Sequence, residues 1–343
     1  MFYADIQKRD FTDRIKQYKY FRKENISFLE FFKIFPLLPK NNNIKFLRKW
    51  DFNKFFLHKI RYNIEPNLFV NSYLLTPKNL SRKSPGVLAL HEHNDEYKAG
   101  KSEVIGMVRN PEYTKLESVE PNKNHKTPES KKQFAYAREL CEKGFIVLAP
   151  DFIGFEEYRD NEWELSDYYN EPYFLRGYEE MIASKFLLHG SSLIIKHLHD
   201  MYVAITILSS LKEVDKKKIG VIGHSLGGEI ATILTAFDSR IKAGVSSCGC
   251  VSYEYFEKSN RMETAEVIIP GFRKEKKDFD FFLDMIQPKP FLTTSGLEDT
   301  PIQVKKLLEK RKKNFRVLFF AGGHSFPEDI RLKAYSFLEE NLC

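Results

Sequence analysis

The sequence predicts an α/β fold, with a mostly parallel central sheet covered by helices, on two observations. Short and nearly continuous apolar runs recur along the chain, which is typical of strands buried on both faces. Helical stretches separate these runs, and such alternation favours a parallel sheet between helices. The expected strands are residues 87–90, 145–149, 219–222, 243–246, 291–294 and 317–320. The expected helices are residues 131–143, 191–211, 228–237, 301–313 and 327–342.

Composition excludes several protein classes. The chain has 343 residues, of which 42% are hydrophobic and 29% charged, so it is long and apolar enough for a folded core. No stretch approaches the roughly 20 apolar residues of a membrane-spanning helix, and the first residues lack the apolar core of a signal peptide. The four cysteines show no disulfide or zinc pattern. We therefore expect no transmembrane segment and a cytoplasmic location.

Residues 1–62 are predicted to be a basic N-terminal helical extension. They hold 15 Lys and Arg against 6 Asp and Glu, which accounts for the net charge of +7. Aromatic residues at helical spacing between residues 10 and 35 predict an amphipathic helix. We favour a helix packed on the main domain, residues 63–343, over contact with an anionic membrane or nucleic acid. No nucleic-acid partner is expected because no such motif occurs, and the sequence predicts no oligomeric state.

The main domain is expected to begin with a hairpin and to carry two inserts. Residues 54–64 and 68–75 are rich in β-forming residues and are separated by a turn at residues 65–67. The inserts follow strands, at about residues 94–130 and 154–183. The second is acidic and aromatic, and ligands in open α/β sheets bind at the carboxyl ends of strands. Trp163 and Tyr168 are therefore candidate substrate-pocket residues.

The segment Gly223–His224–Ser225–Leu226–Gly227 has the GxSxG pattern of a nucleophile elbow. A buried strand precedes it and a helix follows it, which is the setting that this turn needs. A serine in so sharp a turn crowds its own backbone, so small neighbours are required. Ser225 is therefore the candidate nucleophile.

A serine nucleophile needs a general base, which an acid holds in place. His324 follows the expected strand at 317–320, and Glu298 and Asp299 follow the strand at 291–294. Both loops are expected at the same sheet edge as Ser225. His324 is the candidate base, and we favour Asp299 over Glu298 as the acid.

These motifs and their order resemble the α/β-hydrolase superfamily. Residues 87–94 (VLALHEHN) are similar to the His-Gly-His-Gly segment of dienelactone-hydrolase-like and bacterial acetyl-esterase-like members. Residues 147–155 (VLAPDFIGF) resemble their next strand and its Pro-Asp turn, and residues 288–292 (PKPFL) resemble their approach to the acid loop. The resemblance covers about residues 63–342.

The resemblance implies a serine hydrolase that cleaves a small carboxylic ester, by preference an acetyl ester, through an acyl-enzyme. Ser225 would attack the carbonyl, His324 would move the proton and Asp299 would orient His324. The backbone N–H groups of Leu226 and His93 would form the oxyanion hole. Glu92 and Asn94 stand where those relatives have glycines. The candidate pocket residues here are His91, Glu92 and His224. No cofactor is implied.

Three alternatives stay open. A peptidase or amidase of this fold uses the same triad, and a pseudo-hydrolase would bind a ligand without turnover. His91, His93 and Asp95 also come close to a zinc-hydrolase motif. That motif's last histidine is replaced by Glu96, and a zinc mechanism leaves Ser225 and His324 unexplained. We therefore expect no metal.

Overall fold

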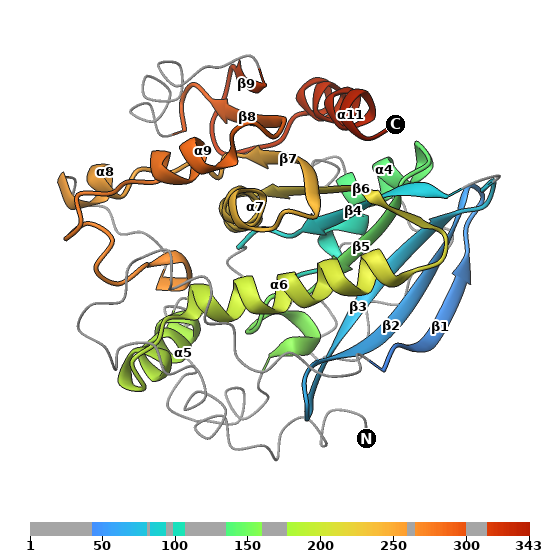
Figure 1. The fold of residues 1–343 in the computed structure, drawn as a ribbon, viewed down its shortest axis with the longest axis horizontal. Coiled ribbons are helices and arrows are strands. Elements are labelled where there is room, and N and C mark those ends of the chain that lie inside the picture. The colour runs from blue at the N-terminus through green and yellow to red at the C-terminus, as the bar shows by residue number, and fades with distance from the viewer. Residues whose placement is uncertain are drawn as a thin grey trace.

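The computed structural model describes residues 43–80, 83–93, 99–106, 135–159, 177–258, 265–299 and 314–343. The strands of these residues form one sheet in the order β1-β2-β3-β5-β4-β6-β7-β8-β9 (Figure 1). They are β1 Lys45–Asp51, β2 Phe55–Glu65, β3 Leu68–Pro77, β4 Ser84–Leu90, β5 Ile146–Pro150, β6 Val214–His224, β7 Ile241–Ser247, β8 Phe291–Gly296 and β9 Phe315–Phe320. The helices are α4 Tyr136–Glu142, α5 Gly177–Leu188, α6 Leu193–Ser210, α7 Leu226–Phe237, α8 Tyr253–Lys258, α9 Asp280–Ile286 and α11 Glu328–Leu342. Three 3-10 turns are η1 Glu103–Ile105, η3 Glu156–Tyr158 and η7 Ala265–Val267.

The six strands from β5 to β9 in this order are parallel, which confirms the predicted mostly parallel sheet. Each expected strand is present, because its residues are apolar on both faces; all five residues of β5 are buried. Helices α4, α6, α7 and α11 lie within the expected helical stretches or begin within two residues of them. The helix expected at 301–313 lies outside the described residues.

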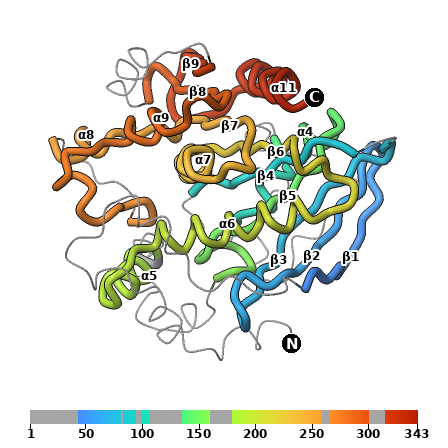
Figure 2. Tube along the Cα trace, in the orientation of Figure 1, coloured from blue at the N-terminus to red at the C-terminus, as the bar shows by residue number. Residues whose placement is uncertain are grey.

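The first three strands form an antiparallel ribbon at one side of the sheet (Figure 2). The predicted hairpin is β2 and β3, and β3 joins β5 in antiparallel pairing. Residues 45–51 and 55–62 belong to the sheet, although they fall within the predicted extension of residues 1–62. The amphipathic helix expected at residues 10–35 lies outside the described residues.

Two apolar layers cover the parallel strands. In β4, Leu88 and Leu90 pack with apolar side chains of α6 and α7, whereas Val87 and Ala89 pack with those of α4 and α11. This alternation follows from the two-residue period of a strand. Figure 1 shows α6 running across the front of the strands. No helix of the described residues is both long and apolar enough to cross a membrane.

Candidate functional site

Ser225 lies in a sharp turn between β6, which ends at His224, and α7, which begins at Leu226. Its φ of 52° and ψ of −123° are values that non-glycine residues rarely adopt. The Ser225 N–H donates to the carbonyl of Ser247 at 2.8 Å, and the N–H of Glu229 donates to the Ser225 carbonyl at 2.9 Å. The surrounding backbone thus holds the serine in a strained conformation, which is a feature of functional turns.

The two glycines of the turn are required by close backbone packing. A β-carbon at Gly227 would lie 2.8 Å from the carbonyl carbon of Leu90, at the end of β4. A β-carbon at Gly223 would lie 2.8 Å from the backbone nitrogen of Gly228. Both distances are shorter than real β-carbons show, so the GxSxG spacing is a packing requirement of this turn.

His324 and Asp299 lie together in the loops after β9 and β8. Nδ1 of His324 is 3.0 Å from Oδ2 of Asp299. The Asp299 side chain is 15% exposed and the His324 side chain 45%, whereas Glu298 is exposed. This geometry leaves Nε2 of His324 as the ring nitrogen that can take a proton from another group.

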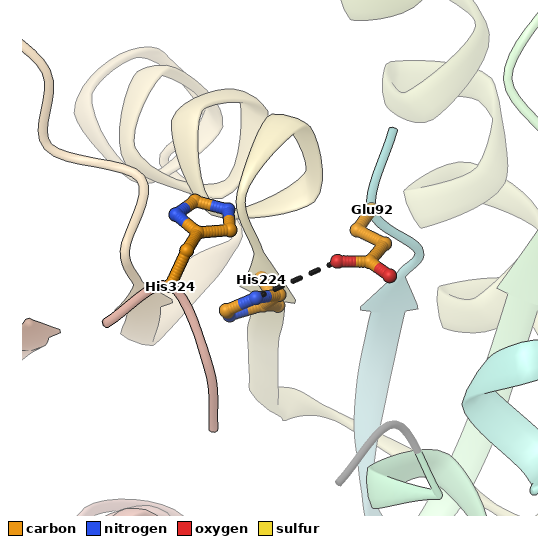
Figure 3. A group of neighbouring side chains, drawn as sticks. All are labelled: Glu92, His224 and His324. Atoms are coloured by element: carbon orange, nitrogen blue, oxygen red, sulfur yellow. Dashed lines mark ion pairs between the residues drawn. The ribbon is translucent and has the colours of Figure 1, made fainter. Parts of the chain in front are cut away.

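His224, Glu92 and His324 form a cluster at the ends of β6, β4 and β9 (Figure 3). Nε2 of His224 lies 3.5 Å from a carboxylate oxygen of Glu92, and its Nδ1 lies 3.0 Å from the Ser247 hydroxyl. The rings of His224 and His324 are 4.9 Å apart. Burial and the nearby His324 hold the pKa of His224 well below its ordinary value. His224 is therefore a neutral, fully buried ring behind His324.

His91 is fully buried and uses both ring nitrogens within the chain. Nε2 accepts a hydrogen bond from the Phe152 N–H at 3.0 Å, and Nδ1 lies 2.8 Å from the Glu92 carbonyl. Burial lowers the pKa of His91 to about 3, so the ring is neutral and donates through Nδ1. Neither nitrogen is left for a substrate or for a metal shared with His93. The expectation that His91 contacts substrate, and the open alternative of an His91–His93–Asp95 zinc site, both conflict with this arrangement.

The His93 side chain faces two carboxylates. It pairs with Glu179 of α5, and its Nε2 lies 3.8 Å from Oε2 of Glu266 in η7. Burial opposes protonation of His93, but the hydrogen bond to Glu179 and the two negative charges outweigh it and raise its pKa to about 9. Burial raises the pKa of Glu266 to about 8, against the attraction of His93. The oxyanion role expected of His93 involves its backbone N–H and not its side chain.

Leu226 occupies the first position of α7, where backbone N–H groups have no partner within the helix. This is where an oxyanion donor beside Ser225 is expected. Trp163, Tyr168 and Asp95, which the sequence also singles out, lie outside the described residues.

Three further residues lie beside these groups and were not predicted from the sequence: Cys248, Glu179 and Glu266. The Cys248 thiol, the Asp299 carboxylate and the His324 ring lie within 4.8 Å of one another. The Cys248 thiol donates a weak hydrogen bond to the Ser325 carbonyl at 3.5 Å. Only the acidic character of the second insert hinted at Glu179, and no sequence signal distinguished Glu266.

Comparisons with known proteins agree with this architecture. Residues 201–318 match the family described as BAAT / acyl-CoA thioester hydrolase C terminal. The chain is 27% identical over 285 residues to a Bacillus subtilis (strain 168) protein named as the hydrolase YtaP. The matched residues cover 79% of this chain and 83% of that protein.

Solved structures of esterases share the fold at low identity. A Bacteroides fragilis protein described as an acetyl xylan esterase has a TM-score of 0.61 and 18% identity over 90% of this chain and 74% of its own. Acetyl xylan esterase 1 of Thermoanaerobacterium sp. has a TM-score of 0.57 and 13% identity. The likeness covers 96% of this chain and 98% of that esterase. These likenesses confirm the predicted α/β-hydrolase fold.

Proposed function

We propose that this member of the α/β-hydrolase superfamily is a serine hydrolase, in which Ser225, His324 and Asp299 cleave a small carboxylic ester. The observation that carries the proposal is the strained strand-to-helix turn at Ser225 together with the 3.0 Å contact between His324 and Asp299. A strained serine at the start of a helix and an acid-held imidazole on the same sheet edge are what acyl transfer requires.

The proposed reaction has two balanced halves. The Ser225 hydroxyl oxygen attacks the ester carbonyl carbon while Nε2 of His324 takes the hydroxyl proton, and Asp299 stabilises the imidazolium that forms. The alcohol leaves with that proton, which produces an acyl-serine. Water then attacks the acyl carbon, His324 takes a proton from it, and Ser225 leaves with the proton as the carboxylic acid is released. The N–H groups of Leu226 and His93 would hold the oxyanion in both halves.

The substrate class we propose is a small acyl ester, with acetyl as the preferred acyl group. The negative charge of Glu92, near His224 and His324, would disfavour an anionic substrate and suit a neutral or cationic one. The match to an acyl-CoA thioester hydrolase family favours a second candidate, a thioester, which the same residues would cleave. Peptide or amide substrates use the same residues but have a poorer leaving group.

Covalent labelling tests the mechanism without a choice of substrate. The purified chain is treated with a fluorophosphonate probe, and the labelled peptide is identified by mass spectrometry. We expect labelling of Ser225 that is lost in Ser225→Ala and strongly slowed in His324→Ala. Ser336→Ala is the matched control, because Ser336 is exposed on α11. A folded wild-type chain that takes no label would overturn the serine mechanism.

Acyl specificity is tested next with matched substrates. Hydrolysis of 4-nitrophenyl acetate, butyrate and octanoate is compared with hydrolysis of the corresponding acetyl thioester. We expect the highest kcat/KM for the acetate ester. A preference for octanoate would reject the proposed acyl size, and a preference for the thioester would favour the second candidate.

A further inference from the structure

His93, Glu179 and Glu266 converge from three separate elements. His93 follows β4, Glu179 lies in the first turn of α5, and Glu266 lies in η7. One ligand atom from each lies within 4.8 Å of the other two. Both carboxylates approach the same atom, Nε2 of His93, which carries at most one proton. One imidazole N–H cannot satisfy two carboxylates.

Glu266 makes the longer of the two contacts with His93. Its side chain is 1% exposed, and Oε2 accepts no hydrogen bond from the described residues. Among those residues its only ion-pair neighbour is His93, at 3.8 Å. Buried carboxylates are costly unless they are hydrogen-bonded, paired or bound to a metal. Oε2 of Glu266 therefore points at the centre of the cluster without a donor.

Two other groups of buried carboxylates in the described residues are each neutralised by a lysine. Lys101 donates to Asp151 at 2.5 Å and to Glu156 at 2.8 Å. Lys196 donates to Glu65 at 2.7 Å and to Asp200 at 2.5 Å. No lysine or arginine of the described residues takes this place at Glu266, so the cluster differs in kind from these two networks.

We propose that His93, Glu179 and Glu266 bind a divalent first-row transition metal ion. One imidazole nitrogen and two carboxylate oxygens are suitable ligands for Zn²⁺, and three protein ligands leave a fourth position for water. The ion would accept a lone pair from Nε2 of His93 and from one oxygen of each glutamate. It would thereby supply the partner that Oε2 of Glu266 lacks.

The site would join the loop after β4 to α5 and η7. The loop after β4 contains His93, whose backbone N–H is the proposed second oxyanion donor, and α5 and η7 come from segments after β5 and β7. An ion at this place would position that loop and would not touch the reacting atoms. The ligand set differs from the His91–His93–Asp95 motif, because both ring nitrogens of His91 form hydrogen bonds within the chain.

Metal binding is measured directly, independently of hydrolase activity. The full chain, free of any affinity tag and stripped with EDTA, is titrated with Zn²⁺ by calorimetry, and Co²⁺ absorption reports the coordination. We expect one equivalent of Zn²⁺ and a Co²⁺ d–d spectrum. Glu266→Gln and Glu179→Gln keep the side-chain shape, and each should weaken binding at least about tenfold. Circular dichroism checks that the variants fold.

Two control variants locate the ion. His324→Ala disrupts the Glu92–His224–His324 and Cys248–Asp299–His324 clusters, which are rival sites, and should retain binding. Glu254→Gln, on α8 and outside all of these clusters, should bind as the wild type does. The proposal is overturned if the folded wild type binds no stoichiometric Zn²⁺ or Co²⁺. It is also overturned if Glu266→Gln binds as tightly as wild type, or if His324→Ala abolishes binding.

Discussion

The Glu92 carboxylate lies 3.5 Å from Nε2 of His224, and the His224 ring lies 4.9 Å from the ring of His324. Figure 3 shows the three side chains converging from the ends of different strands. Glu92 thus places a negative charge beside the base of the proposed reaction, at a position where the family that the sequence resembles has glycine.

We expect Glu92→Gln to change the substrate-charge preference of the proposed hydrolase. Removal of the charge weakens repulsion of anionic esters, so the ratio of kcat/KM for a neutral acetate ester to that for an anionic one should fall several-fold. The ratio is measured at low and at high salt, because screening should reduce the difference. Glu340→Gln, on the exposed face of α11, is the control. An unchanged ratio at low salt would exclude Glu92 from substrate selection.

Asp299 and Glu298 are adjacent in sequence but only Asp299 contacts His324. We expect Asp299→Asn to lower kcat by about 10³-fold or more, because the amide no longer favours the imidazole orientation and charge that proton transfer needs. Glu298→Gln should change kcat by less than about twofold, since surface charges away from the reacting atoms have small effects. Steady-state hydrolysis and the rate of probe labelling measure both. A larger loss in Glu298→Gln would reverse the assignment of the acid.

The turn at Ser225 depends on the absence of a side chain at Gly227. Gly227→Ala places a methyl group against the backbone of Leu90, which no side-chain rotation can relieve. We expect a loss of about 1–3 kcal/mol in the free energy of unfolding, measured with urea, and a loss of probe labelling. Gly323→Ala is the stability control because its β-carbon would have open space. Equal stabilities for the two variants would show that the turn relaxes.

Ser225 and the residues around it were predictable because their signals are local. The buried run of β6, the GxSxG turn and the helix after it are consecutive in sequence. The helix begins two residues earlier than predicted, because the hydrogen bond from Glu229 to Ser225 closes its first turn despite two glycines. The sheet order behind the turn follows from general rules of parallel sheets.

The missed features depend on contacts that local pattern does not encode. Strand β1 is an edge strand whose side chains are mostly exposed, so it lacks the two-face apolar signal of the other strands. Glu179 contacts His93 across 86 positions of sequence. Nothing in the residues around Glu266 distinguishes it from a surface glutamate. Chain folding brings these carboxylates together, and only a three-dimensional arrangement reveals that Oε2 of Glu266 has no donor among the described residues.

His197 is a buried histidine in α6 whose ring nitrogens both lack hydrogen-bond partners among the described residues. Its ring lies 4.9 Å from that of Phe152. Burial, with smaller contributions from His91, Lys196 and His93, lowers the pKa of His197 to about 3. Because the folded pKa lies below the unfolded value of 6.5, unfolding takes up a proton between these pH values. The neutral ring therefore contributes stability above pH 6.5 that is lost as the pH falls toward 3.

We expect His197→Leu and His197→Gln to flatten this dependence by about 1.4 kcal/mol per pH unit between pH 6 and 4, because neither side chain titrates. The two variants separate proton uptake from desolvation. Leucine also removes two buried polar atoms without partners, so it should raise stability at pH 7.5 by about 1 kcal/mol or more, whereas glutamine should not. Urea unfolding at pH 7.5, 6 and 5 measures both effects. Slopes that match the wild type in both variants would mean that His197 is protonated in the folded chain, and its burial would then need a partner for that charge.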